Sequence, residues 1–153
     1  MITKANESHI EELLSLINHT NFHAFKNIIP SPYFLDPILS HQKLIEELEI
    51  ATFYVYWYQD KIVGVIALQI EDKEHGRVKW VYVHPDYQRR GIGRELLMKL
   101  ELEARIIGIK NLKLRTEENA VWAVNFYTKM GFNMIDRIKT DWAFDVIMEK
   151  TLQ

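Results

Sequence analysis

Residues 81–93 read Val-Tyr-Val-His-Pro-Asp-Tyr-Gln-Arg-Arg-Gly-Ile-Gly, and this segment carries the clearest structural signal in the chain. Its first part, Val81–Val83, predicts a strand, which ends before Pro85 because proline cannot donate to a central ladder. Gly91 and Gly93 then open a helix. A strand–turn–helix unit of this kind directs backbone N–H groups toward one point at the positive end of the helix dipole, which favours an anion.

Local positive charge surrounds this turn. Arg89, Arg90 and Arg94 lie within it or just after it, in a chain whose formal net charge is -2. The turn lacks the Gly-Lys-Ser/Thr ending of a Walker loop, and Leu96 stands where a dinucleotide fingerprint needs its third glycine. The segment therefore predicts a diphosphate site of another kind. The alternative is an ordinary helix start with arginines on its surface.

Hydrophobic periodicity extends the pattern over the whole chain. Apolar, β-branched and aromatic runs predict strands over Ile2–Ala5, Phe53–Tyr58, Ile62–Ile70, Arg77–Val83, Leu112–Thr116, Phe132–Ile138 and Ala143–Leu152. Helical spacing predicts helices after a Ser8/Glu11 capping box, from Asp36-Pro37, over Arg94–Ile107 with Gly108 as the stop, and from an Asn119 cap to Gly131. We expect one α/β (α+β) domain over residues 1–153, a mixed twisted sheet of about seven strands flanked by about four helices. The unit from Arg77 to Thr116 should be a parallel crossover.

Composition excludes several classes of function. The chain has 153 residues, of which 48% are hydrophobic and none is cysteine, so it cannot form a disulfide, a thiolate metal site or a cysteinyl intermediate. Residues 1–12 lack the apolar run of a secretory signal, and no stretch of about 18 apolar residues predicts a membrane span. The slightly acidic balance argues against nucleic acid or an anionic membrane as a partner. We expect a cytoplasmic protein, and the scattered histidines predict no metal site.

Two blocks of sequence resemble the GNAT family of N-acetyltransferases. The first matches the family's acyl-CoA-binding pattern, Gln/Arg-x-x-Gly-x-Gly/Ala, with Gln88, Gly91 and Gly93. The second comprises Asn119, Ala123, Phe126, Tyr127, Lys129, Gly131 and Phe132. The order of the predicted elements also matches along nearly the whole chain. The resemblance implies a GNAT-like fold and an acetyl-CoA-dependent N-acetyltransferase.

The resemblance also implies roles for individual residues. The diphosphate of acetyl-CoA, the cosubstrate, should lie on Gln88, Arg89, Arg90, Gly91, Ile92 and Gly93. The backbone of Val81 and Val83 should pair with the pantetheine arm, because that arm carries two amides and a splayed strand offers matching groups; the alternative is that both valines are only core residues. Tyr127 matches the general acid that protonates the departing thiolate. Asn119 either contacts the coenzyme or caps its helix.

The acceptor side is less defined by sequence. The candidates for a general base are Glu117, Glu118 and His84, and a water chain or an acceptor that arrives neutral would need none of them. We expect the acceptor to be a primary amine, on a small molecule or a peptide, attracted by acidic side chains at Asp36, Glu46, Glu47, Glu49, Glu117 and Glu118. The aromatic segment 21–37 either lines the acceptor side or covers it. Two other functions stay open, a non-catalytic acyl-CoA-binding module and a protein N-terminal or lysine acetyltransferase, and a homodimer is compatible with the sequence.

Overall fold

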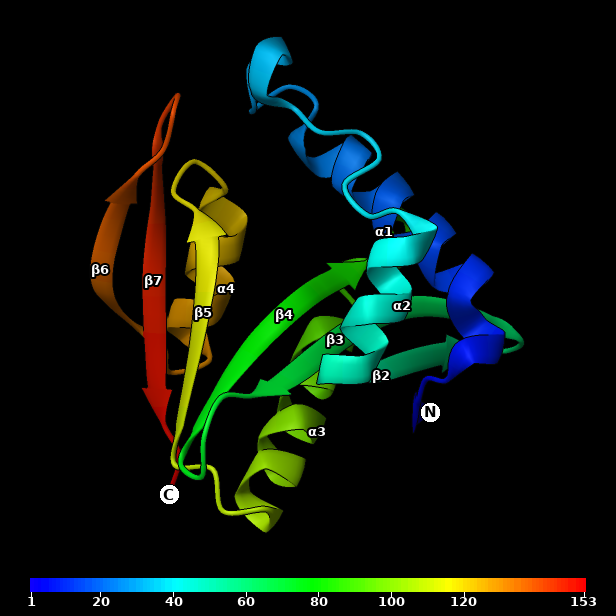
Figure 1. Cartoon of the computed structure of the whole chain (residues 1–153), viewed down its shortest axis with the longest axis vertical. Helices are drawn as coiled ribbons and strands as arrows, with labels where there is room; N and C mark the ends of the chain where they lie inside the picture. The colour runs from blue at the N-terminus through cyan, green and yellow to red at the C-terminus, as the bar shows by residue number, and fades with distance from the viewer.

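A seven-stranded mixed sheet forms the centre of the protein, whose computed structural model describes residues 1–153 (Figure 1). The strands lie in the order β1-β2-β3-β4-β5-β7-β6, and all neighbours are antiparallel except β4 and β5. Their bounds are β1 Ile2–Lys4, β2 Ala51–Tyr58, β3 Lys61–Ile70, β4 His75–Val83, β5 Asn111–Glu117, β6 Asn133–Lys139 and β7 Phe144–Thr151. The predicted fold class and the parallel crossover are confirmed.

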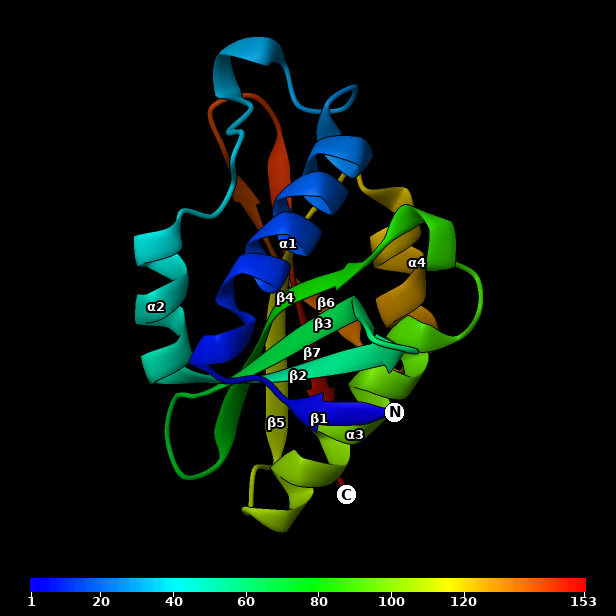
Figure 2. The same cartoon turned by 90° about the vertical axis from the view of Figure 1, so that its right-hand side faces the viewer.

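Four α-helices cover the two faces of this sheet (Figures 1 and 2). Helices α1 (Ile10–Phe25) and α2 (His41–Ile50) pack on one face, and α3 (Ile92–Ile106) and α4 (Val121–Lys129) pack on the other. Three short 3₁₀ helices, η1 (Glu7–His9), η2 (Ser31–Tyr33) and η3 (Pro85–Tyr87), lie in the connections. None of these helices is both long and apolar enough to cross a membrane.

Alternation of side chains along the strands builds a separate core on each face. In β2, Phe53 and Val55 pack with α1 and α2, whereas Tyr54 packs with α3 on the opposite face. Helix α3 fully buries Leu96 and Leu100 one turn apart, and each such leucine contributes about 1.5–3 kcal/mol. The two cores fix the sheet between layers of helices, so any gap between strands connects one face with the other.

Such a gap opens between β4 and β5. The two strands pair only at their beginnings, at His75↔Asn111, Gly76↔Leu112 and Arg77↔Lys113. Beyond this point β5 continues to pair with β7 as far as Glu117↔Asp145, while β4 from Val78 onward has no partner on its β5 side. Figure 1 shows the two strands diverging toward the end that carries α1. The sheet is therefore split into a V.

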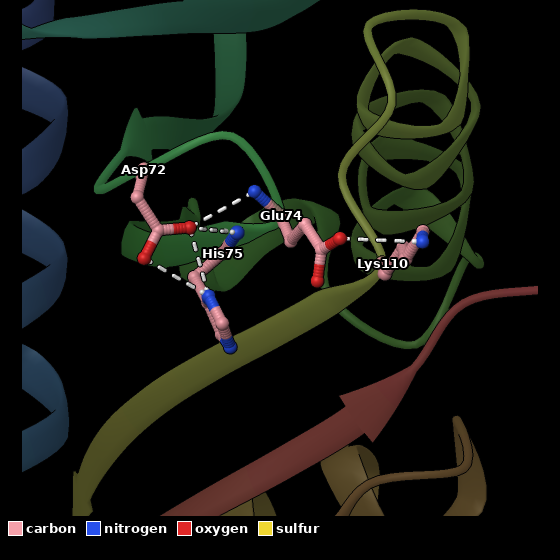
Figure 3. Close-up of polar contacts among 4 residues, drawn as sticks. All are labelled: Asp72, Glu74, His75 and Lys110. Carbon is pink, nitrogen blue, oxygen red and sulfur yellow. Dashed lines mark hydrogen bonds and ion pairs between the residues drawn. The ribbon is translucent and has the colours of Figure 1, made fainter.

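Polar contacts secure the closed end of this V (Figure 3). Asp72 Oδ1 accepts hydrogen bonds from the backbone N–H groups of Glu74 and His75, each at 2.9 Å, which shape the turn that enters β4. The bond from the Glu74 N–H, followed by the bond with the His75 ring, whose Nδ1 lies 2.8 Å from Oδ1, holds the pKa of the Asp72 carboxyl below its usual value. Glu74 Oε1 lies 3.3 Å from Lys110 Nζ, just before β5. The strands are therefore joined at one end and free to separate at the other.

Two helix starts differ from the prediction. Helix α2 begins at His41 and not at Asp36-Pro37, because Ser40 is its cap and accepts from the N–H of Lys43 at 3.1 Å. At the N-terminus, α1 begins after His9 without a side-chain cap, and Asn6 instead caps the preceding η1 by accepting from the N–H of Ser8 at 2.9 Å. In both cases a short polar side chain close in sequence to the predicted one makes the bond.

Candidate active site

A cleft of about 1170 Å³ runs through the gap between β4 and β5. Its walls come from both faces of the sheet. On one face it is lined by residues of α1 and of the segment after it, including Thr20, Asn21 and Phe25. On the other face it is lined by the start of α3 and by α4, including Gly93 and Tyr127. A two-faced cleft of this kind can take two different molecules from opposite sides.

The turn before α3 carries backbone donors without acceptors. No backbone N–H from Gln88 to Arg94 donates to another protein group. Arg89 and Gly91 both have left-handed backbone, with φ of 64° and 81°, and a left-handed residue next to a right-handed one makes a concave nest of N–H groups that suits an anion. A Cβ at Gly91 would meet nothing within 4 Å, so the glycine is required there for its backbone conformation.

Most of the predicted diphosphate residues line the cleft beside this nest. They are Gln88, Arg89, Gly91, Ile92 and Gly93. Arg90 points elsewhere: its guanidinium lies 5.2 Å from the centroid of the Tyr87 ring and donates to the Asp86 carbonyl at 3.4 Å. Arg94, which the sequence placed just after the turn, does line the cleft. Two of the three arginines, Arg89 and Arg94, therefore supply the local positive charge inside it.

The end of β4 presents backbone to the gap. Val83 stands opposite Gly64, and the next residue, His84, donates its N–H to Val63 O at 2.8 Å. This makes Val83 a non-hydrogen-bonded position of the β3 ladder, so its own N–H and C=O point away from β3 and toward β5. Its carbonyl accepts from Gln88 Nε2 at 2.8 Å. Val81 also lines the cleft. Both valines also pack against the α3 and α4 core, so their side chains are core residues while the pairing of their backbone with pantetheine stays a prediction.

Tyr127 lies on the α4 wall with its ring packed and its hydroxyl uncommitted. The residue is 7% exposed, and its ring packs edge-on against Phe126 and Phe132. No protein group forms a hydrogen bond with the hydroxyl, although Tyr127 lines the cleft. Burial, with a smaller contribution from Tyr82, raises the pKa of this phenol above its usual value. At neutral pH the group is therefore protonated and able to donate.

A polar patch on the α1 wall was missed by sequence reasoning. Tyr82 donates its hydroxyl hydrogen to Asn21 Oδ1 at 3.0 Å, and burial raises the pKa of Tyr82 to about 12. Thr20, beside Asn21, is 3% exposed, and its hydroxyl oxygen has no hydrogen-bond partner. The alternation of side chains along a strand could have placed Tyr82 on the α1 side of the sheet, because a residue between Val81 and Val83 projects to the face opposite theirs. The pattern of α1 gave no such signal for Asn21 and Thr20.

The candidate bases are placed very differently. Glu117 lines the cleft, and its Oε1 accepts from the N–H of Asn119 at 2.8 Å. Burial, followed by the nearby Asp145 and Glu118 carboxylates, raises its pKa above the usual value despite that bond. Glu118 is turned away and paired with Arg137, with Oε1 2.9 Å from Nη2. His84 Nδ1 accepts from the Asp86 N–H at 3.1 Å, which occupies that nitrogen.

The other predicted acids do not reach the cleft. Asp36, Glu46 and Glu49 are absent from its lining, and Glu47 is buried under the sheet in an ion pair with Lys79. Asp145 on β7 lines the cleft instead, opposite Glu117 in the ladder, and its Oδ2 lies 2.6 Å from Arg115 Nε. The acidic part of the wall thus comes from the ends of β5 and β7 and not from the N-terminal helices.

Asn119 does not have the predicted capping role. Helix α4 follows Ala120, whose side chain is fully buried, and its start has no side-chain cap. A backbone hydrogen bond closes the turn instead, because the N–H of Ala120 donates to Glu117 O at 3.0 Å. Asn119 is exposed and outside the lining of the cleft.

The structure has no group of three or more His, Asp or Glu side chains placed to hold a metal ion.

A known family model matches most of the chain. Residues 15–132 match the model of the acetyltransferase (GNAT) family. The amino-acid acetyltransferase of Pseudomonas syringae pv. syringae is 33% identical over 104 residues, which is 66% of this chain but only 23% of that relative. The matched segment thus spans less than a quarter of the curated relative.

Solved structures give the same result along the full length. The PaiA N-acetyltransferase of Thermoplasma acidophilum, in complex with coenzyme A, superposes with a TM-score of 0.87 at 24% identity over 99% of this chain and 98% of that one. The smu.2055 protein of Streptococcus mutans UA159 gives 0.84 at 25% identity over 100% and 99%. The first likeness shows the fold, and the family model covers more than half of the chain. The chain belongs to the acetyltransferase (GNAT) family.

Proposed function

We propose that this protein transfers the acetyl group of acetyl-CoA directly to a primary amine. The observation that carries the proposal is the cleft through the split sheet, with a nest of acceptor-free N–H groups at one mouth and an uncommitted phenol inside. A coenzyme entering from the α3 and α4 face and an amine entering from the α1 face would meet within the gap. Direct transfer in a ternary complex needs such two-sided access.

Coenzyme binding follows from the groups on the first face. The N–H nest from Gln88 to Arg94, at the start of α3, suits the diphosphate because oriented N–H groups and the helix dipole both favour negative charge. Arg89 and Arg94 add charge in the same wall. The pantetheine amides can pair with the N–H and C=O of Val83, with Gln88 giving up its bond to that carbonyl. Val81 extends the same edge.

The chemistry requires one acid and a route for one proton. The neutral amine attacks the thioester carbonyl carbon, the C–S bond then breaks, and the thiolate takes a proton from the Tyr127 hydroxyl. The nitrogen of the tetrahedral intermediate, an ammonium, loses its extra proton as the amide forms, and Glu117 is the candidate acceptor that lines the cleft. Its raised pKa brings it closer to that of a base working near neutral pH. A bound water would return this proton from Glu117 to the Tyr127 phenolate, so that the net change is the transfer of one proton from the amine to the sulfur.

The acceptor is proposed to be a primary amine that is cationic in solution. Glu117 supports this, because it is a half-buried carboxylate in the cleft wall without an ion-pair partner. Asp145 adds negative charge, partly offset by Arg115. Among related proteins, one is described as an amino-acid acetyltransferase and another as the ribosomal-protein-S18-alanine N-acetyltransferase of Escherichia coli, so amines on metabolites and on peptides both belong in the test.

The test is release of free coenzyme A from acetyl-CoA with a panel of acceptors. Polyamines, amino acids, aminoglycosides and basic peptides are compared with hydroxyl and carboxylate-rich acceptors at equal concentration. We expect turnover only with amines, and faster turnover as pH rises. Turnover confined to alcohols or acids contradicts the proposal. Binding of coenzyme A without turnover of any acceptor would favour the non-catalytic module instead.

Direct transfer makes a second, independent prediction. Mass spectrometry of the protein with acetyl-CoA alone should show no stoichiometric acetyl adduct, because the chain has no cysteine to carry one. An adduct that an amine then discharges would replace direct transfer with a two-step mechanism.

A further inference from the structure

Strand β4 changes its side-chain alternation just where the V opens. Its pairing with β3 moves from Lys79↔Ala67 to Tyr82↔Val65, so β4 uses three steps where β3 uses two. This is a β-bulge with one extra residue on β4. As a result Val78 and Val81, three residues apart, both pack on the α3 and α4 face, while Tyr82 packs on the α1 and α2 face.

The bulge decides which groups face the coenzyme. Without the extra residue, strict alternation after Val78 would put Val81 and Val83 on the α1 and α2 face and Tyr82 on the other. The backbone groups of β4 that point to β3 and those that point to the gap would exchange at the same time. The acceptor-side bond from Tyr82 to Asn21 would then be lost. The bulge must therefore be held firmly in place.

The bulge has a strained residue at its centre. Trp80 has left-handed backbone with φ of 53°, a conformation that is unfavourable for a large residue that is not glycine. The sequence here offers no glycine, and the local chain alone does not favour this geometry. The surrounding structure must supply what holds Trp80 in this conformation.

A buried carboxylate from α2 holds both residues at the bulge. Glu47 is 1% exposed, and its Oε1 accepts from Trp80 Nε1 at 2.6 Å and lies 2.5 Å from Lys79 Nζ. Lys43, one turn earlier on α2, lies 4.0 Å from the other oxygen. Burial alone would raise the pKa of Glu47, but the bonds from Lys79 and Trp80 and the charges of Lys79 and Lys43 outweigh it, so the pKa lies below its usual value.

We propose that Glu47 is a positioning residue for the coenzyme: its bonds to Lys79 and Trp80 hold the β4 bulge, which in turn directs Val81 and Val83 into the gap. The inference rests on the proposed binding of coenzyme A at that edge. Glu47 is outside the lining of the cleft, so it acts through the strand and touches neither substrate. The ion pair spans the sheet face and links α2 to the site.

The chain contains a matched control for this residue. Glu101 on α3 is 4% exposed, pairs with Lys150 Nζ at 2.6 Å, and has Arg105 one turn later on its own helix at 3.9 Å. It resembles Glu47 in burial and in having one cross-element lysine and one i,i+4 cation. It lies outside the cleft, and its lysine is on β7 near the C-terminus. Substituting each by glutamine removes the same charge at two places.

The experiment measures coenzyme A binding by titration calorimetry, well below the melting temperature of each variant. We expect Glu47→Gln to weaken coenzyme A binding about tenfold, the size expected when backbone hydrogen bonds to a ligand are lost. Glu101→Gln should stay within about twofold of wild type, as expected for a distant site, although its melting temperature also falls. Equal affinities of Glu47→Gln and wild type would overturn the proposal, and so would an equal loss in Glu101→Gln.

A rescue variant tests the route through Trp80. Glycine adopts left-handed backbone without strain, so Trp80→Gly added to Glu47→Gln should restore much of the coenzyme A affinity. A double variant that binds no better than Glu47→Gln contradicts the route through the strained residue.

Failure of the proposed function would look different. Wild-type protein would then bind no coenzyme A at all. In that case amide hydrogen exchange over Lys79–Val83 still decides whether Glu47 holds the bulge, because Glu47→Gln should speed exchange there and Glu101→Gln should not. Unchanged exchange in both variants would remove Glu47 from this role.

Discussion

Two strand–turn–helix units lie side by side in this protein and begin their helices in opposite ways. The turn from β4 to α3 leaves the N–H groups of Gln88–Arg94 without protein acceptors. The turn from β5 to α4 satisfies its own, since Glu118 donates to Phe144 O, Asn119 to the Glu117 carboxylate and Ala120 to Glu117 O. The first unit thus offers a run of free N–H donors of the kind that suits an anion. The second leaves only the N–H groups of Val121 and Trp122, at the start of α4, without a protein acceptor, and it presents Glu117 and Tyr127 to the cleft.

The difference between the two turns assigns the two parts of the proposed function, coenzyme binding and acetyl transfer, to different units. The β4–α3 unit should determine coenzyme affinity, and the β5–α4 unit should determine the rate of transfer. Substitutions in the first are then expected to change binding, whereas those in the second change kcat with little effect on coenzyme binding. Four substitutions test this division.

The largest effect is expected from Gly91→Glu. The new carboxylate would stand in the N–H nest, and like charges brought together cost several kcal/mol, so coenzyme A binding should weaken on the order of 1000-fold. Gly108→Glu is the matched control. Both glycines have left-handed backbone, with φ of 81° and 92°, and neither would place a Cβ within 4 Å of another group. A similar loss in both variants, measured by calorimetry, would show that backbone strain and not the site is responsible.

Next comes Tyr127→Phe in the second unit. Losing a positioned general acid should lower kcat by about 100-fold with little change in the KM for acetyl-CoA. Because burial raises the pKa of Tyr127, the wild-type rate should fall on the alkaline side only above the usual phenol value of about 10. Tyr54→Phe is the control, since Tyr54 is 3% exposed on the same face and outside the cleft. An unchanged kcat, with chemistry rate-limiting, would remove Tyr127 from the role.

Glu117→Gln should have a smaller effect, about tenfold on kcat at neutral pH, because water can replace a general base in part. Wild-type activity should rise with pH through a Glu117 pKa that lies above its usual value, and the variant should lose that limb. Glu118→Gln, at the neighbouring carboxylate paired with Arg137, should keep it. A pH–rate profile that is the same in wild type and Glu117→Gln contradicts the role.

Glu117→Gln should increase the stability of the folded protein although it lowers kcat. A carboxyl group whose pKa is raised in the folded state makes folding less favourable once pH exceeds its unfolded pKa. Glu117→Gln should therefore raise the melting temperature at neutral pH, and the difference should shrink with falling pH and vanish below the unfolded glutamate pKa of about 4.3, where both states bind the proton. Thermal melts across this pH range measure it.

The smallest effect is expected from Asn119→Ala. Its side chain is exposed, makes no cap and lies outside the cleft, so coenzyme A affinity and kcat should stay within about twofold. A larger loss of coenzyme affinity would support the Asn119–coenzyme contact implied by the family pattern. It would also show that the β5–α4 unit contributes to coenzyme binding.

The sequence predicted the first unit better than the second for a physical reason. Pro85, Gly91 and Gly93 are strong local signals, because each restricts or frees the backbone in a specific way. The start of α4 has no such residue: Ala120 was missed since its turn is closed by backbone bonds that the sequence does not display. Tyr127 was named only through resemblance to a family, and its uncommitted hydroxyl is a property of the packed structure.

Features that depend on tertiary contacts could not be predicted from the sequence. Nothing in the order of residues marks the bulge at Trp80, which a helix from another part of the chain stabilises through Glu47. Glu47 was predicted to attract the acceptor, yet it faces the sheet because it lies one turn after the buried Leu44 on the same side of α2. Asp145 was missed because its contribution comes from its register opposite Glu117.

The most direct test of the division follows backbone amides by ¹H–¹⁵N NMR during titration with coenzyme A. The amides from Gln88 to Arg94 should shift most, because the diphosphate would become their acceptor, and that of Val83 should shift with them. The amides of Glu118, Asn119 and Ala120 should move little, since their acceptors lie within the protein. Larger shifts in the turn before α4 than in the turn before α3, or binding without shifts at Gln88–Arg94, would contradict the account.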